Sequence, residues 1–148
     1  MFLPIAISLG IVALTILIHG TGSIFLVKYL FEKHNTYSET IGFTKAMKVL
    51  CSTAIFLVVL HFIEIMIWGI CILIIPNIEQ INNIEEALYF SMVTYTTVGY
   101  GDIVLIPYWR VMSGFEAMNG ILLFGWSSAL FFSIVQRILA TLHPNKKI

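Results

Sequence analysis

The residues of this chain most suited to a specific chemistry are those at positions 97–102, Thr-Val-Gly-Tyr-Gly-Asp, which lie between two hydrophobic runs. A cation that leaves water needs its hydration oxygens replaced, and backbone carbonyl groups can replace them if successive carbonyls point at one axis. Ordinary strands and helices point them elsewhere, so the backbone must adopt conformations that residues with a Cβ resist. Gly99 and Gly101 permit those conformations. The spacing therefore predicts a cation-binding site built from main-chain oxygens.

The composition is that of a membrane protein. Of the 148 residues, 59% are hydrophobic and 11% are charged, whereas soluble domains have roughly 45–50% apolar and about 25% charged residues. The formal net charge is zero, which argues against nucleic acid as a partner. The sequence contains no zinc-ligand spacing, phosphate-binding loop or nucleophile–base pattern. We therefore expect an integral membrane protein that is not an enzyme and needs no cofactor.

Three hydrophobic runs are long enough to cross a bilayer, because about 20 apolar residues of helix span its hydrocarbon core. They predict an N-terminal transmembrane helix over residues 1–32, an outer helix over 49–75 and an inner helix over 111–142. A polar run that begins at His19, His-Gly-Thr-Gly-Ser, interrupts the first of them. The chain thus divides into an additional N-terminal helix and a domain that covers residues 49–142.

A shorter helix is predicted between the last two spans, over residues 83–96. The asparagines at 82–83 can cap its first turn, and Glu85 and Glu86 suit the positive end of a helix dipole. This helix is too short to span the bilayer, and non-helical backbone at membrane depth is tolerated only where it lines a polar or ion-filled path. The predicted fold is an all-α membrane protein with three transmembrane helices and a re-entrant pore helix that leads into residues 97–102.

The basic residues predict the orientation, because cytoplasmic loops of membrane proteins are enriched in lysine and arginine. Most of them flank the first connection or lie near the C-terminus: Lys28, Lys33, Lys45, Lys48, Arg137, Lys146 and Lys147. Arg110 alone lies on the side of the re-entrant segment, together with several acidic residues. We therefore expect the N-terminus and residues 97–102 outside, and the loop 32–48 and the C-terminus in the cytoplasm.

Residues 88–102, Leu-Tyr-Phe-Ser-Met-Val-Thr-Tyr-Thr-Thr-Val-Gly-Tyr-Gly-Asp, resemble the pore region of tetrameric potassium channels. The patterns H-x-x-E-I-x-x-W at 61–68 and E-A-M-N-G-I-L-L-F-G-W-S at 116–127 extend this to a resemblance to small bacterial three-helix ion-channel proteins. The resemblance implies passive, potassium-selective conduction across the bacterial inner (cell) membrane, with K⁺, lipid and further copies of the chain as partners. Because each chain has one such segment, the pore requires a homotetramer.

The resemblance also implies which residues bind the ion. The expected ion-binding residues are Thr97, Val98, Gly99, Tyr100 and Gly101. The carbonyl groups of the first four, and the Thr97 hydroxyl, would hold K⁺ in place of water. Tyr89 and Phe90 occupy the positions of an aromatic pair that surrounds the filter in the family. Residues 97–102 are called the filter segment below.

The residues expected to support the filter segment differ from those of better-known channels. In some bacterial channels a carboxylic acid at the position of Val93 pairs with the aspartate at the position of Asp102. That pairing is absent here, so the support must come from elsewhere. Glu116 on the inner helix is expected to support the pore helix from behind, through Tyr95 or Thr94. The alternative is that Glu116 faces the conduction path and attracts cations.

Gly120 aligns, by its distance from the filter segment, with the inner-helix hinge of the family. It is therefore the candidate gating hinge. The alternative is that a glycine at this position only allows helices to pack closely.

Three polar residues within the spans form a candidate intramembrane network. His61 and Glu64 share one face of the outer helix, and His19 lies at a similar depth in the first span. Charged groups in hydrocarbon are costly unless they are paired or face water. The three can form a hydrogen-bonded packing network, a pH-sensitive element, since histidine titrates near neutrality, or a metal site.

Two alternative functions stay open beside potassium-selective conduction. The chain can be a weakly selective monovalent cation channel, because the filter motif does not guarantee its own rigidity. It can also be a non-conducting membrane subunit that regulates other channels. No span carries an arginine at every third position, so voltage sensing of the usual kind is not expected.

Overall fold

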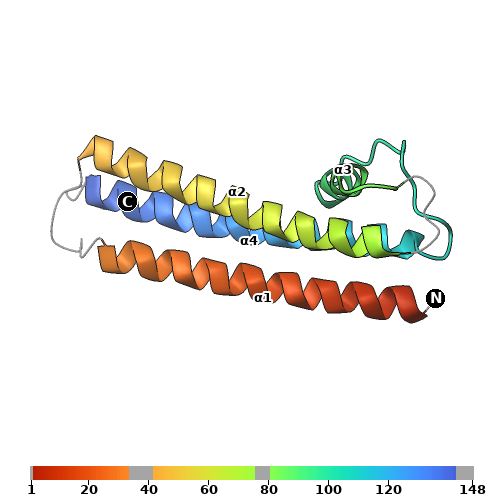
Figure 1. Cartoon of the computed structure of the whole chain (residues 1–148). Coiled ribbons are helices and arrows are strands. Elements are labelled where there is room, and N and C mark those ends of the chain that lie inside the picture. The colour runs from red at the N-terminus through yellow and green to blue at the C-terminus, as the bar shows by residue number, and fades with distance from the viewer. Residues whose placement is uncertain (1, 34–41, 76–80, 143–148) are drawn as a thin grey trace.

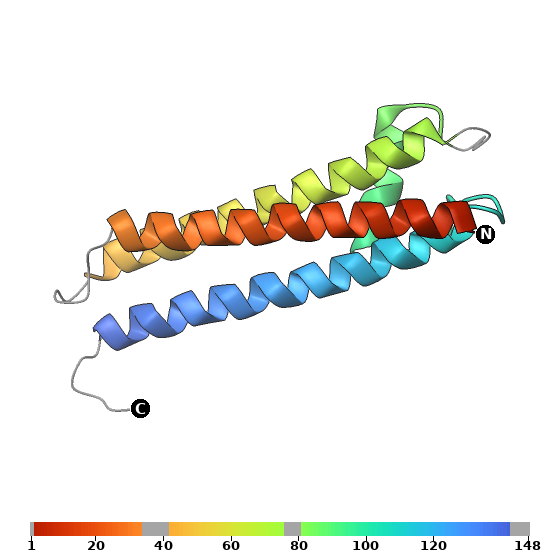
Figure 2. The same cartoon turned by 90° about the horizontal axis from the view of Figure 1, so that it is seen from below.

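The structure, a computed structural model, describes residues 2–33, 42–75 and 81–142. Within these ranges the regular elements are all helices, with three long ones, α1 (Phe2–Lys33), α2 (Phe43–Ile74) and α4 (Arg110–Leu142), and one short one, α3 (Ile84–Tyr95). The three long helices run side by side, and α3 lies at one end of the bundle (Figures 1 and 2). Each long helix is apolar and long enough to cross a membrane. The predicted all-α class with three transmembrane spans is confirmed.

The direction of the helices places the start of α1 at the same end of the bundle as α3. The first turn of α1, the end of α2, α3 and the connection from α3 to α4 all lie at the same end of the bundle (Figure 1). Helix α4 then runs to the opposite end. Helices of 32 and 33 residues are about 48–50 Å long, which exceeds the bilayer core of about 30 Å. Their ends therefore extend into the interfacial layers.

The outer helix begins earlier than the sequence predicts, at Phe43 and not at residue 49. Hydropathy marks where a helix enters lipid, whereas its hydrogen bonds continue through polar residues at the interface. Lys45 and Lys48 lie in this first part of α2 with exposed side chains, which long basic side chains tolerate by reaching water. The other three helices end within one residue of the predicted limits.

The polar run of the first span does not interrupt α1, which is one continuous helix. The Thr21 hydroxyl donates to the carbonyl of Leu17 (2.8 Å), so it is satisfied within its own helix. Gly22 faces α2 so closely that an added Cβ would lie 3.0 Å from the Leu60 side chain. The run therefore lets α1 pack closely against α2.

Helix α3 begins with a reciprocal cap. The Asn83 side chain accepts a hydrogen bond from the Glu86 amide (2.9 Å), and the Glu86 carboxylate accepts one from the Asn82 amide (2.6 Å). Each bond satisfies a backbone donor that the helix itself leaves free. The start of the pore helix is therefore fixed by its own sequence.

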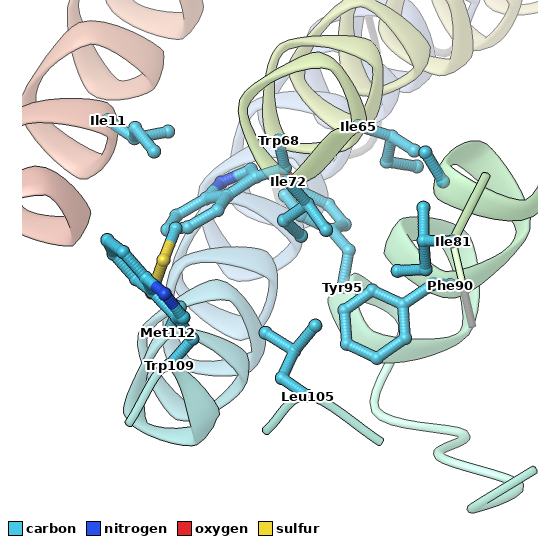
Figure 3. Close-up of a cluster of buried hydrophobic side chains, with 11 residues drawn as sticks. Ile11, Ile65, Trp68, Ile72, Ile81, Phe90, Tyr95, Leu105, Trp109 and Met112 are labelled. Atoms are coloured by element: carbon cyan, nitrogen blue, oxygen red, sulfur yellow. The ribbon is translucent and has the colours of Figure 1, made fainter. Parts of the chain in front are cut away.

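Two buried hydrophobic clusters hold the bundle together. The one near α3 includes Trp68 and Ile72 of α2, fully buried between Ile11 of α1 and the side chains Phe90 and Tyr95 of α3 (Figure 3). The second cluster lies toward the other end and joins α1, α2 and α4; its buried members are Leu26, Ala46, Val49, Leu57, Ile134 and Ile138. Helix α1 is thus packed against the other helices at both ends.

Some of the basic residues that predict the orientation lie outside the described residues. Lys146 and Lys147 fall there, as do residues 34–41 of the predicted loop 32–48.

Candidate ion-binding site

The backbone of the filter segment alternates between two conformations. Thr97, Gly99 and Gly101 have φ angles of 62°, 52° and 80°, in the left-handed region, and the residues between them do not. Alternation of positive and negative φ can turn successive peptide groups the same way, so that amides face one side and carbonyls the other. The segment can therefore present a row of carbonyl oxygens to one axis.

Thr97 is the one non-glycine residue with a positive φ in the part of the chain that the structure describes. The left-handed region costs an L-residue roughly 1–2 kcal/mol, and such strain persists where the surroundings hold it. The Thr97 amide donates to the carbonyl of Thr94 (2.9 Å) at the end of α3. The strain thus lies at the junction of the pore helix and the filter segment.

Main-chain bonds anchor the filter segment to α3. The Gly99 amide donates to the carbonyl of Val93 (3.0 Å), and the Thr96 amide and hydroxyl both donate to the carbonyl of Met92 (3.1 and 2.6 Å). Val93, which the sequence places beside the filter segment, contacts it through its backbone oxygen. Its apolar side chain makes no pair with Asp102.

Tyr89 is the side chain that pairs with Asp102. Its hydroxyl donates to Oδ2 of Asp102 (2.7 Å), across 13 residues of chain. This hydrogen bond lowers the pKa of the Asp102 carboxyl, and backbone amides add to the effect. It also raises the pKa of the Tyr89 phenol, because the neutral donor is favoured next to a carboxylate. The sequence placed Tyr89 in an aromatic pair and missed this bond.

Gly120 of α4 lies directly against the end of α3. A Cβ added at Gly120 would clash with the carbonyl of Tyr95 and lie 3.1 Å from the Tyr95 ring. Only glycine allows the two helices to approach this closely. The alternative interpretation of Gly120, close helix packing, is therefore a contact with Tyr95 of α3. The hinge role of Gly120 stays a prediction.

Glu116 does not connect to the filter through Tyr95 or Thr94, which the sequence had suggested. The Tyr95 hydroxyl donates to Glu64 of α2 instead (2.6 Å). Glu116 is fully buried, close to Ser91 of α3, and neither side chain has a hydrogen-bond partner among the described residues. Glu116 therefore lies behind the pore helix, as expected, but it does not make the expected contact.

The structure brings His19, His61 and Glu64 together. Nδ1 of His19 lies 2.8 Å from Oε1 of Glu64, and Nδ1 of His61 lies 3.1 Å from Oε2. Ser127 of α4, which the sequence did not single out, lies 2.9 Å from Nε2 of His61 and 3.2 Å from Nε2 of His19. With the Tyr95 hydroxyl, the network joins all four helices, and we call these five residues the polar cluster.

A single chain cannot surround an ion with its filter segment. The side chains of Val98 and Tyr100 are 52% and 73% exposed, and a hollow of about 330 Å³ lies beside the segment, lined by Thr97, Gly99 and Gly101 among others. Two large side chains this exposed on one short segment call for cover from another surface.

The family of the chain agrees with this geometry. A family model described as "Ion channel" matches residues 49–137, which is more than half of the chain. The chain belongs to this ion-channel family. The matched region contains most of α2, all of α3 and the filter segment, and most of α4, whereas α1 lies before it.

A curated relative is the potassium voltage-gated channel protein shk-1 of Caenorhabditis elegans, to which the channel is 46% identical over 48 residues. The aligned part is 32% of this chain and 9% of the relative, so the channel spans a small fraction of the relative's length. No solved structure matches.

Proposed function

We propose that the chain forms a potassium-selective channel that conducts K⁺ passively through carbonyl rings of the filter segment. The observation that carries this proposal is the left-handed φ at Thr97, Gly99 and Gly101, because it lets successive carbonyls face one axis. The family and the name of the curated relative support the same activity. No cofactor other than the permeant ion is needed.

The conducting unit in this proposal is a homotetramer. Each chain supplies one filter segment, and carbonyl rings of the potassium-channel type are built from four. The exposure of Val98 and Tyr100 supports this assembly, since a neighbouring copy would cover both. The filter residues then have their carbonyls toward the axis and their side chains toward the neighbour.

The proposed location is the bacterial cell membrane, with the filter segment and the N-terminus outside and the C-terminus in the cytoplasm. The lysines near the first connection support this orientation. The arrangement in Figure 1 agrees with it, because the start of α1 lies at the same end of the bundle as α3.

Selective conduction is favoured over weakly selective conduction by the anchoring of the filter segment. Its middle is tied to α3 by the Gly99–Val93 bond, and its outer end by the Asp102–Tyr89 bond. A segment held at two points resists the widening that would admit other monovalent cations with their water.

The experiment is ion flux into proteoliposomes that contain the purified full chain, with K⁺ or Na⁺ as the permeant ion. The proposal expects K⁺ flux well above Na⁺ flux, blocked by barium, and a tetrameric mass in detergent. Equal fluxes of the two ions would show a weakly selective channel instead. Absence of flux from a correctly assembled tetramer would favour a regulatory subunit.

A further inference from the structure

The polar cluster is not used by the proposed conduction mechanism. It lies within the membrane-spanning part, and the side chains of His19, Glu64 and Tyr95 are fully buried, with His61 at 7% exposure. It links α1, which lies outside the matched family region, to the helices of the pore. Such buried ionisable groups in a membrane protein mark functional sites by default.

Four potential metal-ligand atoms converge in this cluster. A ring nitrogen of His19, a ring nitrogen of His61 and a carboxylate oxygen of Glu64 lie within 4.8 Å of one another, and in both histidines Nδ1 faces the carboxylate. The hydroxyl oxygen of Tyr95 is a fourth, 2.6 Å from Oε2 of Glu64 and 3.3 Å from Nδ1 of His61.

These spacings suit a tetrahedral metal ion. In a zinc site with bonds of 2.0–2.2 Å, the ligand atoms are separated by roughly 3.3 Å. The hydrogen-bonded pairs among the two Nδ1 atoms, the Tyr95 hydroxyl and the two carboxylate oxygens of Glu64 are 2.6 to 3.3 Å apart. Each of these hydrogen-bonded pairs differs from the zinc spacing by less than an ångström, a change that small side-chain rotations can supply.

Two neutral histidines cannot satisfy all the hydrogen bonds of the cluster while Glu64 is ionised. If Glu64 is ionised, both Nδ1 atoms must carry protons to face it, which leaves both Nε2 atoms as acceptors. Both Nε2 atoms face Ser127, whose hydroxyl has one proton to donate. One lone pair would then remain unpaired in a buried site, and an additional proton or a bound metal cation would remove that cost.

We propose that the cluster is a site for a divalent transition metal of the zinc class, held by His19, His61, Glu64 and Tyr95. Imidazole nitrogen and carboxylate oxygen are typical ligands of zinc. The four come from three helices, with the histidines on α1 and α2, so the metal would join the additional helix to the pore domain. Tyr95 precedes the strained Thr97 by two residues, which brings this junction close to the filter segment.

Ser127 would contact the two histidine ligands of such a site and not the metal itself. With a metal on both Nδ1 atoms, each Nε2 carries a proton, and both can donate to the two lone pairs of the Ser127 hydroxyl oxygen. Metal-binding histidines usually donate their other ring N–H in this way. Neither Nε2 atom is then left without a hydrogen-bond partner.

The charges of the metal-bound cluster balance. The metal-free cluster is neutral with one additional proton on Glu64 or on a histidine. A dication replaces that proton and the phenol proton of Tyr95, so two protons leave and the two positive charges face one carboxylate and one phenolate. The buried site is neutral before and after binding, as a low-dielectric environment requires.

The test is metal binding by the full chain, purified without a histidine tag and with His34 and His143 both replaced by glutamine. Zn²⁺ is supplied during expression, and its content is measured by elemental analysis; Co²⁺ is then exchanged in as a spectroscopic probe. We expect about one metal ion per chain and the intense visible bands of four-coordinate Co²⁺. Absence of stoichiometric metal, an octahedral spectrum, or thiolate bands from Cys51 or Cys71 would overturn the proposal.

Two variants make the assignment specific. His19→Gln removes a ligand and should abolish stoichiometric binding; retention of the metal would contradict the site. Ser127→Ala leaves all four ligands and should weaken metal affinity by about 10- to 100-fold, as loss of an outer partner does. If His19→Gln fails to fold, Ser127→Ala and the Co²⁺ spectrum still decide. The measurements need no ion flux, so the inference stands or falls separately from the proposed conduction.

Discussion

The hydroxyl of Tyr89 donates a 2.7 Å hydrogen bond to the carboxylate of Asp102, so the first half of α3 holds the outer end of the filter segment. The inner part is held by the second half of α3, where the carbonyl of Val93 accepts from the Gly99 amide. The pore helix thus fixes the segment at two heights. In a carbonyl-lined site this matters, because selectivity depends on oxygens that keep their positions.

Tyr89→Phe should weaken selectivity without preventing assembly. The change removes the donor to Asp102 and keeps the ring, so the outer end of the filter segment becomes free to move. We expect a several-fold lower ratio of K⁺ to Na⁺ flux in proteoliposomes. Tyr108→Phe is the matched control, since Tyr108 is also an exposed tyrosine on the outer side. Unchanged selectivity in Tyr89→Phe would show that the bond is not part of the filter's support.

The same bond predicts how the channel responds to acid outside. The hydrogen bond from Tyr89 lowers the pKa of Asp102 below its ordinary value of about 3.9. Ionised Asp102 therefore stabilises the folded outer end of the filter segment at pH values above that ordinary pKa. This contribution to stability is lost as the pH falls through the lowered pKa. K⁺ flux measured from about pH 7 to about pH 3 should persist through mild acid. In Tyr89→Phe the loss should begin at a higher pH, and an identical profile would contradict the assignment.

The sequence predicted the helices well because membrane helices follow composition. Runs of apolar residues define the spans, and a capped helix too short to cross defines α3. The start of α2 at Phe43 was missed because hydropathy reports contact with lipid and not the extent of helical hydrogen bonding. His61 and Glu64 were placed on one face by helical spacing, with His19 at matching depth, and the structure brings these three together.

The contacts that depend on tertiary geometry had no sequence signal. Between Tyr89 and Asp102 the chain leaves the helix, so no fixed spacing connects them. Serines in transmembrane helices commonly bond to their own backbone, and Ser127 could not be told apart from those. Glu116 was placed behind the pore helix, but its neighbour on α3 depends on the rotation of α4, which hydropathy does not determine.

Gly99→Ala should abolish selective conduction and leave membrane insertion intact. Nothing lies within 4 Å of a Cβ added at Gly99, so an alanine side chain would have space in the single chain. The obstacle to alanine is the φ angle of 52°. An alanine there costs roughly 1–2 kcal/mol in the left-handed region, and turning the peptide to relieve it would remove carbonyl oxygens from the axis. The measurement is K⁺ and Na⁺ flux together with membrane extraction. Gly114→Ala, at a position with open space and no positive φ, serves as the control, and selectivity that survives Gly99→Ala would contradict the proposed filter.

Gly120→Ala should lower the stability of the folded channel. The new Cβ would meet the backbone carbonyl of Tyr95, and backbone cannot rotate away as a flexible side chain can. Forced contacts of this kind typically cost about 1–3 kcal/mol, and here they would displace α4 from the end of α3. Thermal unfolding in detergent should therefore begin at a lower temperature. Gly125→Ala on the same helix has open space around its Cβ and should be neutral or slightly stabilising, because alanine is the better helix former by about 1 kcal/mol. A hinge without a packing role predicts the opposite pattern for Gly120→Ala, with unchanged unfolding and altered gating.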